Sequence, residues 1–89
     1  MENIYIRTGY TDMGKQLNAL ADIIQYSFKL DPYSNSLFLF CGRRADRIKA
    51  VRYEGDGFCL LYKRYESGRL KRPGTGEDAK QISAQQLRS

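Results

Sequence analysis

The chain has 89 residues and a formal net charge of +5, and 42% of its residues are hydrophobic while 28% are charged. A chain of this length and composition is expected to form one folded domain with a single core. The sequence contains two cysteines and no histidine, which argues against zinc sites and against the Ser-His and Cys-His pairs of nucleophilic enzymes. We therefore expect a non-catalytic protein with no cofactor and no bound metal.

No segment has the pattern of a membrane span or a signal peptide. The longest uninterrupted apolar run, Leu37 to Cys41, has five residues, whereas a membrane-spanning helix needs about 20. The first residues, Met1-Glu2-Asn3, lack the basic start of a signal peptide. We expect a cytoplasmic protein that does not have a membrane as its partner.

The positive charge is concentrated in the middle of the chain. Residues Cys41 to Arg72 include ten basic and four acidic residues, whereas the remainder carries five basic and six acidic ones. A localised positive field attracts polyanions and releases counterions from a phosphate backbone, so nucleic acid is the leading partner class. An anionic membrane surface fits less well, because no basic amphipathic helix carries the charge. A solvated basic face with no partner is the remaining interpretation.

The N-terminal third predicts a strand followed by a helix. Asn3 to Arg7 alternates β-branched and aromatic residues, which indicates a short strand, and Thr8-Gly9-Tyr10 is typical of a turn. Thr11 or Asp12 is a suitable N-cap for a helix over residues 12–28. The helix has one apolar stripe, which we expect to pack on a sheet; it consists of Met13, Leu17, Leu20, Ile24 and Phe28.

The middle of the chain predicts three strands. Ser36 to Cys41 is a compact apolar run bounded by turn residues, as in a central strand that is buried on both faces. Arg47 to Tyr53 and Phe58 to Arg64 flank Glu54-Gly55-Asp56-Gly57, a sequence that favours a tight hairpin with positive φ angles.

The hairpin has two alternative registers. With Gly55 and Asp56 at the tip, one face pairs Tyr53 with Phe58, Val51 with Leu60, and Lys49 with Tyr62. The other face then pairs Arg52 with Cys59, Ala50 with Leu61, and Ile48 with Lys63. A bulge at Gly57 would shift the register by one residue and exchange the faces.

The C-terminal segment predicts only short elements. Arg69 to Arg72 is a candidate edge strand that Pro73 ends, and Gly74 to Lys80 has the composition of a polar, mobile loop. Ser83 and Gln86 form a capping box for a short C-terminal helix. The expected fold class is therefore α+β: a mostly antiparallel β-meander with one main packed helix and a short C-terminal helix.

Basic and aromatic residues converge on the predicted hairpin. The start of its first strand lies beside the end of its second, so the basic residues at these positions can merge into one patch. The candidate nucleic-acid-binding residues are Arg43, Arg44, Arg47, Lys49, Lys63 and Arg64. The candidate residues for binding a protein partner are Tyr53, Phe58 and Tyr62. Cys41 and Cys59 lie in apolar strands, and we expect them to be buried and inert.

Three motifs, in order along the chain, carry a resemblance to a known family. They are Thr8-Gly-Tyr-Thr-Asp-Met13, Asp31-Pro-Tyr-Ser-Asn-Ser-Leu-Phe-Leu-Phe-Cys-Gly-Arg-Arg-Ala-Asp-Arg-Ile-Lys49, and Tyr53-Glu-Gly-Asp-Gly-Phe58 with Leu61-Tyr-Lys-Arg64. Over roughly Asn3 to Leu87 the chain resembles the TnpB accessory protein, also called the Orf2-like protein, of insertion sequence family sixty-six. The resemblance implies one accessory domain over residues 1–89, with a C-terminal helix that is truncated relative to the family.

The family resemblance also implies a function in DNA recombination. It implies a bacterial protein, encoded beside a much larger transposase, that assists transposition without being the catalytic subunit. The family's basic and aromatic signature falls on Arg43, Arg44, Arg47, Lys49, Tyr62, Lys63 and Arg64, and its turn falls on Gly55, Asp56 and Gly57. Two hypotheses follow. In the first, the basic residues contact DNA phosphates; in the second, the chain is an adaptor that binds the transposase through the aromatic face of the hairpin.

Overall fold

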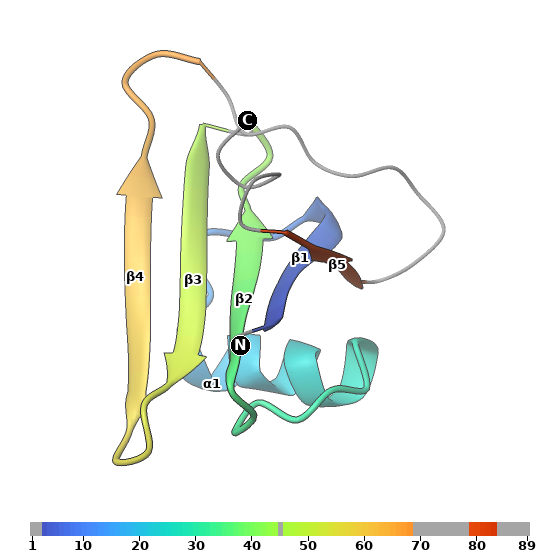
Figure 1. Ribbon diagram of the computed structural model, residues 1–89. Helices are drawn as coiled ribbons and strands as arrows, with labels where there is room; N and C mark the ends of the chain where they lie inside the picture. The colour runs from blue at the N-terminus through green and yellow to red at the C-terminus, as the bar shows by residue number, and fades with distance from the viewer. Residues whose placement is uncertain (1–2, 45, 69–78, 84–89) are drawn as a thin grey trace.

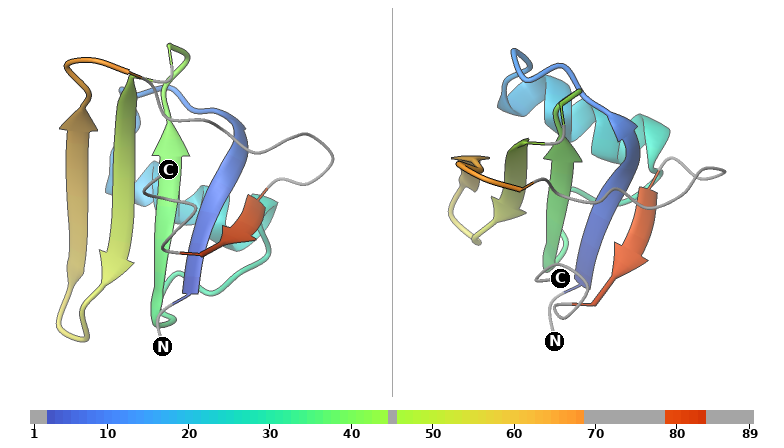
Figure 2. Two further views of the ribbon diagram at one scale, coloured as in Figure 1. Left: turned by 45° about the horizontal axis from the view of Figure 1, so that its top comes forward. Right: turned by 90° about the horizontal axis from the view of Figure 1, so that it is seen from above.

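The computed structural model describes residues 3–44, 46–68 and 79–83. Five strands form one mixed sheet in the order β4-β3-β2-β1-β5, and a helical segment covers one face of it (Figures 1 and 2). The elements are β1 (Asn3–Tyr10), α1 (Leu17–Asp22), the π-helical η1 (Ile23–Ser27), β2 (Ser36–Cys41), β3 (Arg47–Tyr53), β4 (Phe58–Arg64) and β5 (Ala79–Ile82). The predicted α+β class is confirmed. No helix among the described residues is long and apolar enough to cross a membrane.

The sheet combines a meander with one parallel pair. β2, β3 and β4 are antiparallel neighbours in chain order, as predicted, and β2 is the central strand. β1 instead pairs with β2 in parallel, with Asn3 opposite Ser36 and Ile6 opposite Leu39. The segment between β1 and β2 contains the helix and returns the chain to the end of the sheet at which β1 began. A second strand that starts at this end must run parallel to the first.

The hairpin adopts the register predicted without a bulge. Tyr53 pairs with Phe58, and each following pair matches through Arg47 and Arg64. The backbone N–H of Glu54 donates to the carbonyl of Gly57 at 2.8 Å, which closes the loop. Gly55 has a φ of 92°, a conformation that residues with a Cβ rarely adopt. The face that carries Val51 and Leu60 is therefore the face under the helix.

The helix begins later than predicted. Its N-cap is Gln16, which makes no side-chain capping bond, so neither Thr11 nor Asp12 has the predicted capping role. The Asp12 carboxylate instead accepts the N–H of Gly14 at 2.9 Å, and the N–H of Lys15 donates to the Asp12 carbonyl at 3.1 Å. These local turn bonds compete with helix formation over residues 12–15, and glycine weakens a helix further.

The C-terminal part differs from the prediction where the structure describes it. Ala79 and Lys80, predicted to lie in a polar, mobile loop, begin β5, which pairs antiparallel with β1. The predicted edge strand, Arg69 to Arg72, and the loop residues 74–78 lie outside the described residues. The predicted C-terminal helix, with Ser83 as its cap, falls on residues 84–89 and lies outside the described part of the chain. The four residues of β5 form a strand because the outer edge of β1 presents backbone groups with which they pair.

The core lies on both faces of the central strand. On the helix face, Leu20 and Ile24 pack with Phe38, Phe40 and Val51, all of which are fully buried. All five residues of the predicted stripe pack in this cluster: Leu20 and Ile24 are buried, whereas Leu17, Phe28 and Met13 are partly buried, and Met13 precedes the helix. On the other face, a second cluster is formed by Ile6, Leu39, Cys41 and Ile48. Cys41 is buried, as predicted, whereas Cys59 is only partly buried, and the two do not form a disulfide.

Candidate nucleic-acid interface

The parallel pairing of β1 and β2 brings two distant loops together. The last pair of this ladder joins Tyr10 to Cys41, and the N–H of Thr11 then donates to the Cys41 carbonyl at 2.7 Å. The segments that follow the two strands begin at residues 11 and 42, and they therefore start side by side at the carboxyl end of this parallel pair (Figure 2). The crevice outside the carboxyl ends of parallel strands is a recurrent place for ligands.

A depression of about 350 Å³ lies between these two loops. Its floor includes Gly42, which is so close to Met13 that a Cβ at this glycine would lie 3.0 Å from the Met13 Cγ atom. The residues that line the depression are Tyr10, Thr11, Asp12, Met13, Gly42, Arg43, Arg44, Asp46 and Arg47. Three of them are arginines and two are aspartates, and the Asp46 carboxylate lies 3.9 Å from the Arg47 guanidinium. The hollow therefore keeps a small excess of positive charge, which Arg43 and Arg44 supply.

Tyr10 and Arg43 form a cation–π pair in the lining of the depression. The guanidinium carbon of Arg43 lies 5.7 Å from the centre of the Tyr10 ring, which is within the range of a cation–π interaction. The Tyr10 side chain is still 54% exposed. A planar cation beside an accessible ring can contact a phosphate and a base at the same time.

A second hollow of about 680 Å³ continues along the helix face of the sheet. It shares Asp12, Met13 and Arg47 with the first depression and extends to Leu60 and Tyr62 on β4. We call the two hollows together the basic groove. The exposed ring of Tyr10 lines the first hollow and that of Tyr62, 53% exposed, lines the second, while Arg47 lines both.

The predicted basic residues do not all lie in the basic groove. Arg43 and Arg44 are exposed in the turn after β2, and Arg47 lies between the two hollows. Arg64 is the cross-strand partner of Arg47, so its Cα atom lies beside the groove. Lys63 is on the opposite face, where its ammonium lies 4.9 Å from the centre of the Tyr65 ring. Of the six predicted residues, four line the basic groove, namely Arg43, Arg44, Arg47 and Lys49, while Arg64 lies beside it and Lys63 lies on the opposite face.

Lys49 has a different environment from the arginines. It is only 7% exposed, and its ammonium donates to the backbone carbonyl of Lys15 at 2.8 Å. This bond ties the loop before α1 to the middle of β3, and both elements line the second hollow. Lys49 thus holds one wall of the groove in place.

The predicted aromatic residues lie at two separate places on the hairpin of β3 and β4. Tyr53 and Phe58 lie at the hairpin end, with their ring centres 5.0 Å apart. Tyr33, from the loop before β2, packs on both rings at 5.0 Å and 5.2 Å and is 61% exposed. We call these three residues the aromatic cluster. Tyr62 lies further along the strand in the basic groove.

Comparison with known proteins identifies the family. The sequence profile of the IS66 Orf2-like protein matches residues 2–89. The chain belongs to this family. Its relatives include two uncharacterized proteins of Sinorhizobium fredii (strain NBRC 101917 / NGR234): y4hO, which is 38% identical over 94% of this chain and 73% of its own length, and y4jC, which is 28% identical over 94% and 72%. No solved structure matches the chain significantly. Membership of the IS66 Orf2-like family, which is an accessory and non-catalytic one, indicates a transposition-associated accessory protein.

Two residues of these surfaces are absent from the sequence-based prediction. Tyr10 belongs to the first family-like motif, but its place beside Arg43 depends on the parallel pairing of β1 with β2. Tyr33 precedes β2 in a segment without regular structure, and its contact with Tyr53 joins residues twenty positions apart. The family-like motif that contains Tyr10 could have indicated Tyr10, whereas no local pattern in the sequence indicated Tyr33.

Proposed function

We propose that this IS66 Orf2-like protein binds DNA through the basic groove and thereby assists transposition without performing the chemistry. The observation that carries the proposal is the convergence of Arg43, Arg44 and Arg47 on the first hollow, with the exposed ring of Tyr10 beside them and that of Tyr62 in the second hollow. Arginine guanidinium groups form charge-assisted hydrogen bonds with phosphate oxygens, and these contacts position a protein on DNA without selecting a sequence.

The roles of the individual residues follow from their positions. Arg44 is exposed in the turn after β2, so it is available for a phosphate contact. Arg64 and Lys63, at the end of β4, extend the positive surface beyond the groove on the two faces of the sheet. Tyr10 offers a ring face for stacking on an accessible base. We assign Lys49 the supporting role described above, because its ammonium is already bound.

Salt dependence of duplex binding is the direct test. Each phosphate contact contributes about −0.9 to the slope of log affinity against log salt concentration. The Arg44→Ala variant should weaken binding about equally on all duplex sequences and flatten the slope by roughly one contact. Lys29→Ala removes the same charge from the end of the helical segment, outside the groove, and is the matched control. Absence of measurable duplex affinity at low salt would refute the proposal.

Variants of Tyr10 test whether the groove stacks on bases in addition to contacting phosphates. If Tyr10 stacks on a base, Tyr10→Ala should weaken binding to single-stranded DNA by about 1–3 kcal/mol, whereas Tyr10→Phe should retain the affinity. If both variants bind like the wild type, the groove contacts the backbone alone. Fluorescence anisotropy with a labelled oligonucleotide measures both quantities.

A second candidate function rests on the aromatic cluster. The exposed ring of Tyr33, held against Tyr53 and Phe58, is the kind of anchor that is enriched in protein interfaces. As an adaptor, the chain would bind its cognate transposase through this cluster, and the basic groove would meet an acidic partner surface. Tyr33→Ala and Arg44→Ala should then both reduce capture of the transposase, while DNA binding alone stays weak even at low salt.

A further inference from the structure

The outer edge of β4 is the longest open strand edge of the sheet among the described residues. β4 is the terminal strand of the order β4-β3-β2-β1-β5 and has seven residues, whereas the strand at the other end, β5, has four. Figure 1 shows β4 at the margin of the sheet along its whole length. An open edge presents unpaired backbone N–H and C=O groups that can hydrogen-bond to another chain.

The hydrogen-bonding pattern shows which backbone groups point outward. In an antiparallel ladder, bonded pairs alternate with non-bonded pairs. Two bonds at the ends of this ladder, from the N–H of Glu54 to Gly57 and from the N–H of Tyr65 to Asp46, mark bonded pairs. The alternation between them directs the backbone groups of four residues away from β3; these are Phe58, Leu60, Tyr62 and Arg64.

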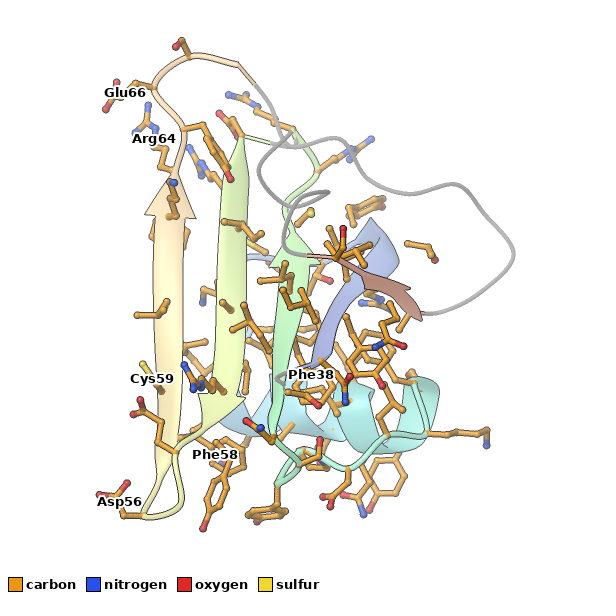
Figure 3. The ribbon with its side chains drawn as sticks, viewed as in Figure 1. Phe38, Asp56, Phe58, Cys59, Arg64 and Glu66 are labelled. Carbon is orange, nitrogen blue, oxygen red and sulfur yellow. The ribbon has the colours of Figure 1, made fainter. Side chains whose placement is uncertain are left out.

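The side chains along this edge are uncharged over most of its length. Phe58-Cys59-Leu60-Leu61-Tyr62 contains no charged residue, and Leu61 and Tyr62 are 57% and 53% exposed. Protected edges carry lysine, proline or a bulge in the strand. β4 has charges only at its two ends: Glu54 and Asp56 precede it in the hairpin, and Lys63 and Arg64 end it. Figure 3 shows Asp56 and Arg64 at opposite ends of the strand.

We propose that β4 pairs with β4 of a second copy of this chain, in an antiparallel arrangement centred on Leu61. An antiparallel pair places the acidic hairpin of one copy beside the basic end of the other, whereas a parallel pair would place like charges together. With Leu61 opposite its own counterpart, Phe58 faces Arg64 and Leu60 faces Tyr62, so all four residues with outward backbone groups are paired. Asp56 is then the diagonal neighbour of Arg64, within reach of the long guanidinium side chain. Glu66, beyond the end of the strand, falls opposite Asp56 of the other copy in this register, and this like-charge pair offsets part of the attraction between the two ends.

The arrangement is closed, because a two-fold axis through the Leu61 pair uses the same edge of both copies. It joins two five-stranded sheets into one and keeps both helices on the same side. Leu61 lies opposite Ala50, on the face away from the helix and from the basic groove. The pairing can therefore be tested separately from DNA binding.

A charge exchange at position 61 tests the symmetry. In each single variant, Leu61→Lys or Leu61→Glu, like charges face each other across the axis, and self-association should weaken by about tenfold or more, equivalent to ~1.4 kcal/mol. An equimolar mixture of the two variants should recover a dimer, because opposite charges then meet. Tyr26→Lys, at a side chain that is 69% exposed on the helical segment, is the control and should dimerise like the wild type. Sedimentation equilibrium over a range of concentrations measures each association.

A cross-link tests the register. In the Cys59→Ser background, Leu61→Cys should form an intermolecular disulfide on mild oxidation, because opposed Cα atoms of a non-bonded pair are about 4.5 Å apart. Lys63→Cys in the same background should not cross-link, since the two copies of that position lie roughly 13 Å apart along the strand. A wild-type monomer at all concentrations, an open polymer, or association only with DNA or with another protein would overturn the proposal.

Discussion

The two ends of the sheet differ in the side chains that they present. At the groove end, the loops after β1 and β2 present Arg43, Arg44 and Tyr10 around a hollow. At the hairpin end, Tyr33 joins the ring pair of Tyr53 and Phe58, beside the acidic residues of the turn. Aromatic residues are thus combined with arginines at one end and lie beside acidic residues at the other. A composition rich in basic and aromatic residues therefore does not define a single surface, because the direction of each strand decides at which end of the sheet its residues lie.

The largest expected effect is on the core that underlies both ends. Leu20 is fully buried in a cluster that includes Met13 of the groove and Phe58 of the hairpin end. Leu20→Ala should lower the free energy of unfolding by roughly 2–5 kcal/mol, because it leaves a cavity in the core. Urea denaturation measures the loss, and amide hydrogen exchange shows whether both ends are affected. Protection lost at one end alone would mean that the ends are independent units.

The next effect concerns the wall of the groove. Lys49→Met keeps the buried aliphatic stem but removes the bond to the Lys15 carbonyl. We expect stability to fall by about 1–2 kcal/mol, and DNA affinity to fall further because the loop before α1 is no longer tied to β3. Lys15→Met is the matched control, since it removes an exposed charge and leaves the backbone carbonyl in place. Equal effects of the two variants on DNA affinity would show that charge alone matters.

A smaller effect is expected at the hairpin end. Tyr33→Ala removes two ring contacts from the aromatic cluster, and the free energy of unfolding should fall by about 1 kcal/mol. DNA affinity and its salt slope should remain unchanged, because the cluster lies outside the basic groove. Tyr26→Ala, at a more exposed tyrosine, should change stability less. A change in the salt slope of the Tyr33 variant would contradict the separation of the two ends.

The smallest expected effect is a gain in stability in the connection from the helix to Tyr33. Lys29 has a φ of 58°, in the left-handed region, and the next residue, Leu30, donates its N–H to the Ile24 carbonyl at 3.0 Å. This is the geometry of a helix C-terminus that usually takes glycine. Lys29→Gly should stabilise the protein by about 0.5 kcal/mol, whereas Lys29→Ala, which keeps a Cβ, should not. Thermal unfolding of both variants tests the difference.

Much of the sheet was predictable because its patterns are local. The alternation in the hairpin and the glycines at its tip predicted two strands in one of two registers, and the structure has the register that pairs Tyr53 with Phe58. The helix start was not predictable in the same way, since Asp12 is an acceptable cap by type but uses its carboxylate in a turn with Gly14. Lys49 was predicted as a DNA contact for its charge, and its burial against the Lys15 carbonyl depends on how the loop packs on β3.

Local patterns in the amino-acid sequence predicted the α+β class, the buried central strand and the apolar stripe of the helix, because each follows from a period of two or of 3.6 residues within one segment. For the hairpin, the sequence left two registers open. Three features are visible only in the tertiary structure: β1 runs parallel to β2, β5 pairs with β1, and Tyr10 consequently lies beside Arg43. These pairings join residues tens of positions apart. Whether such a pairing forms depends on the entropy of closing the loop and on the complete packing of the core, and neither quantity is expressed in a local pattern.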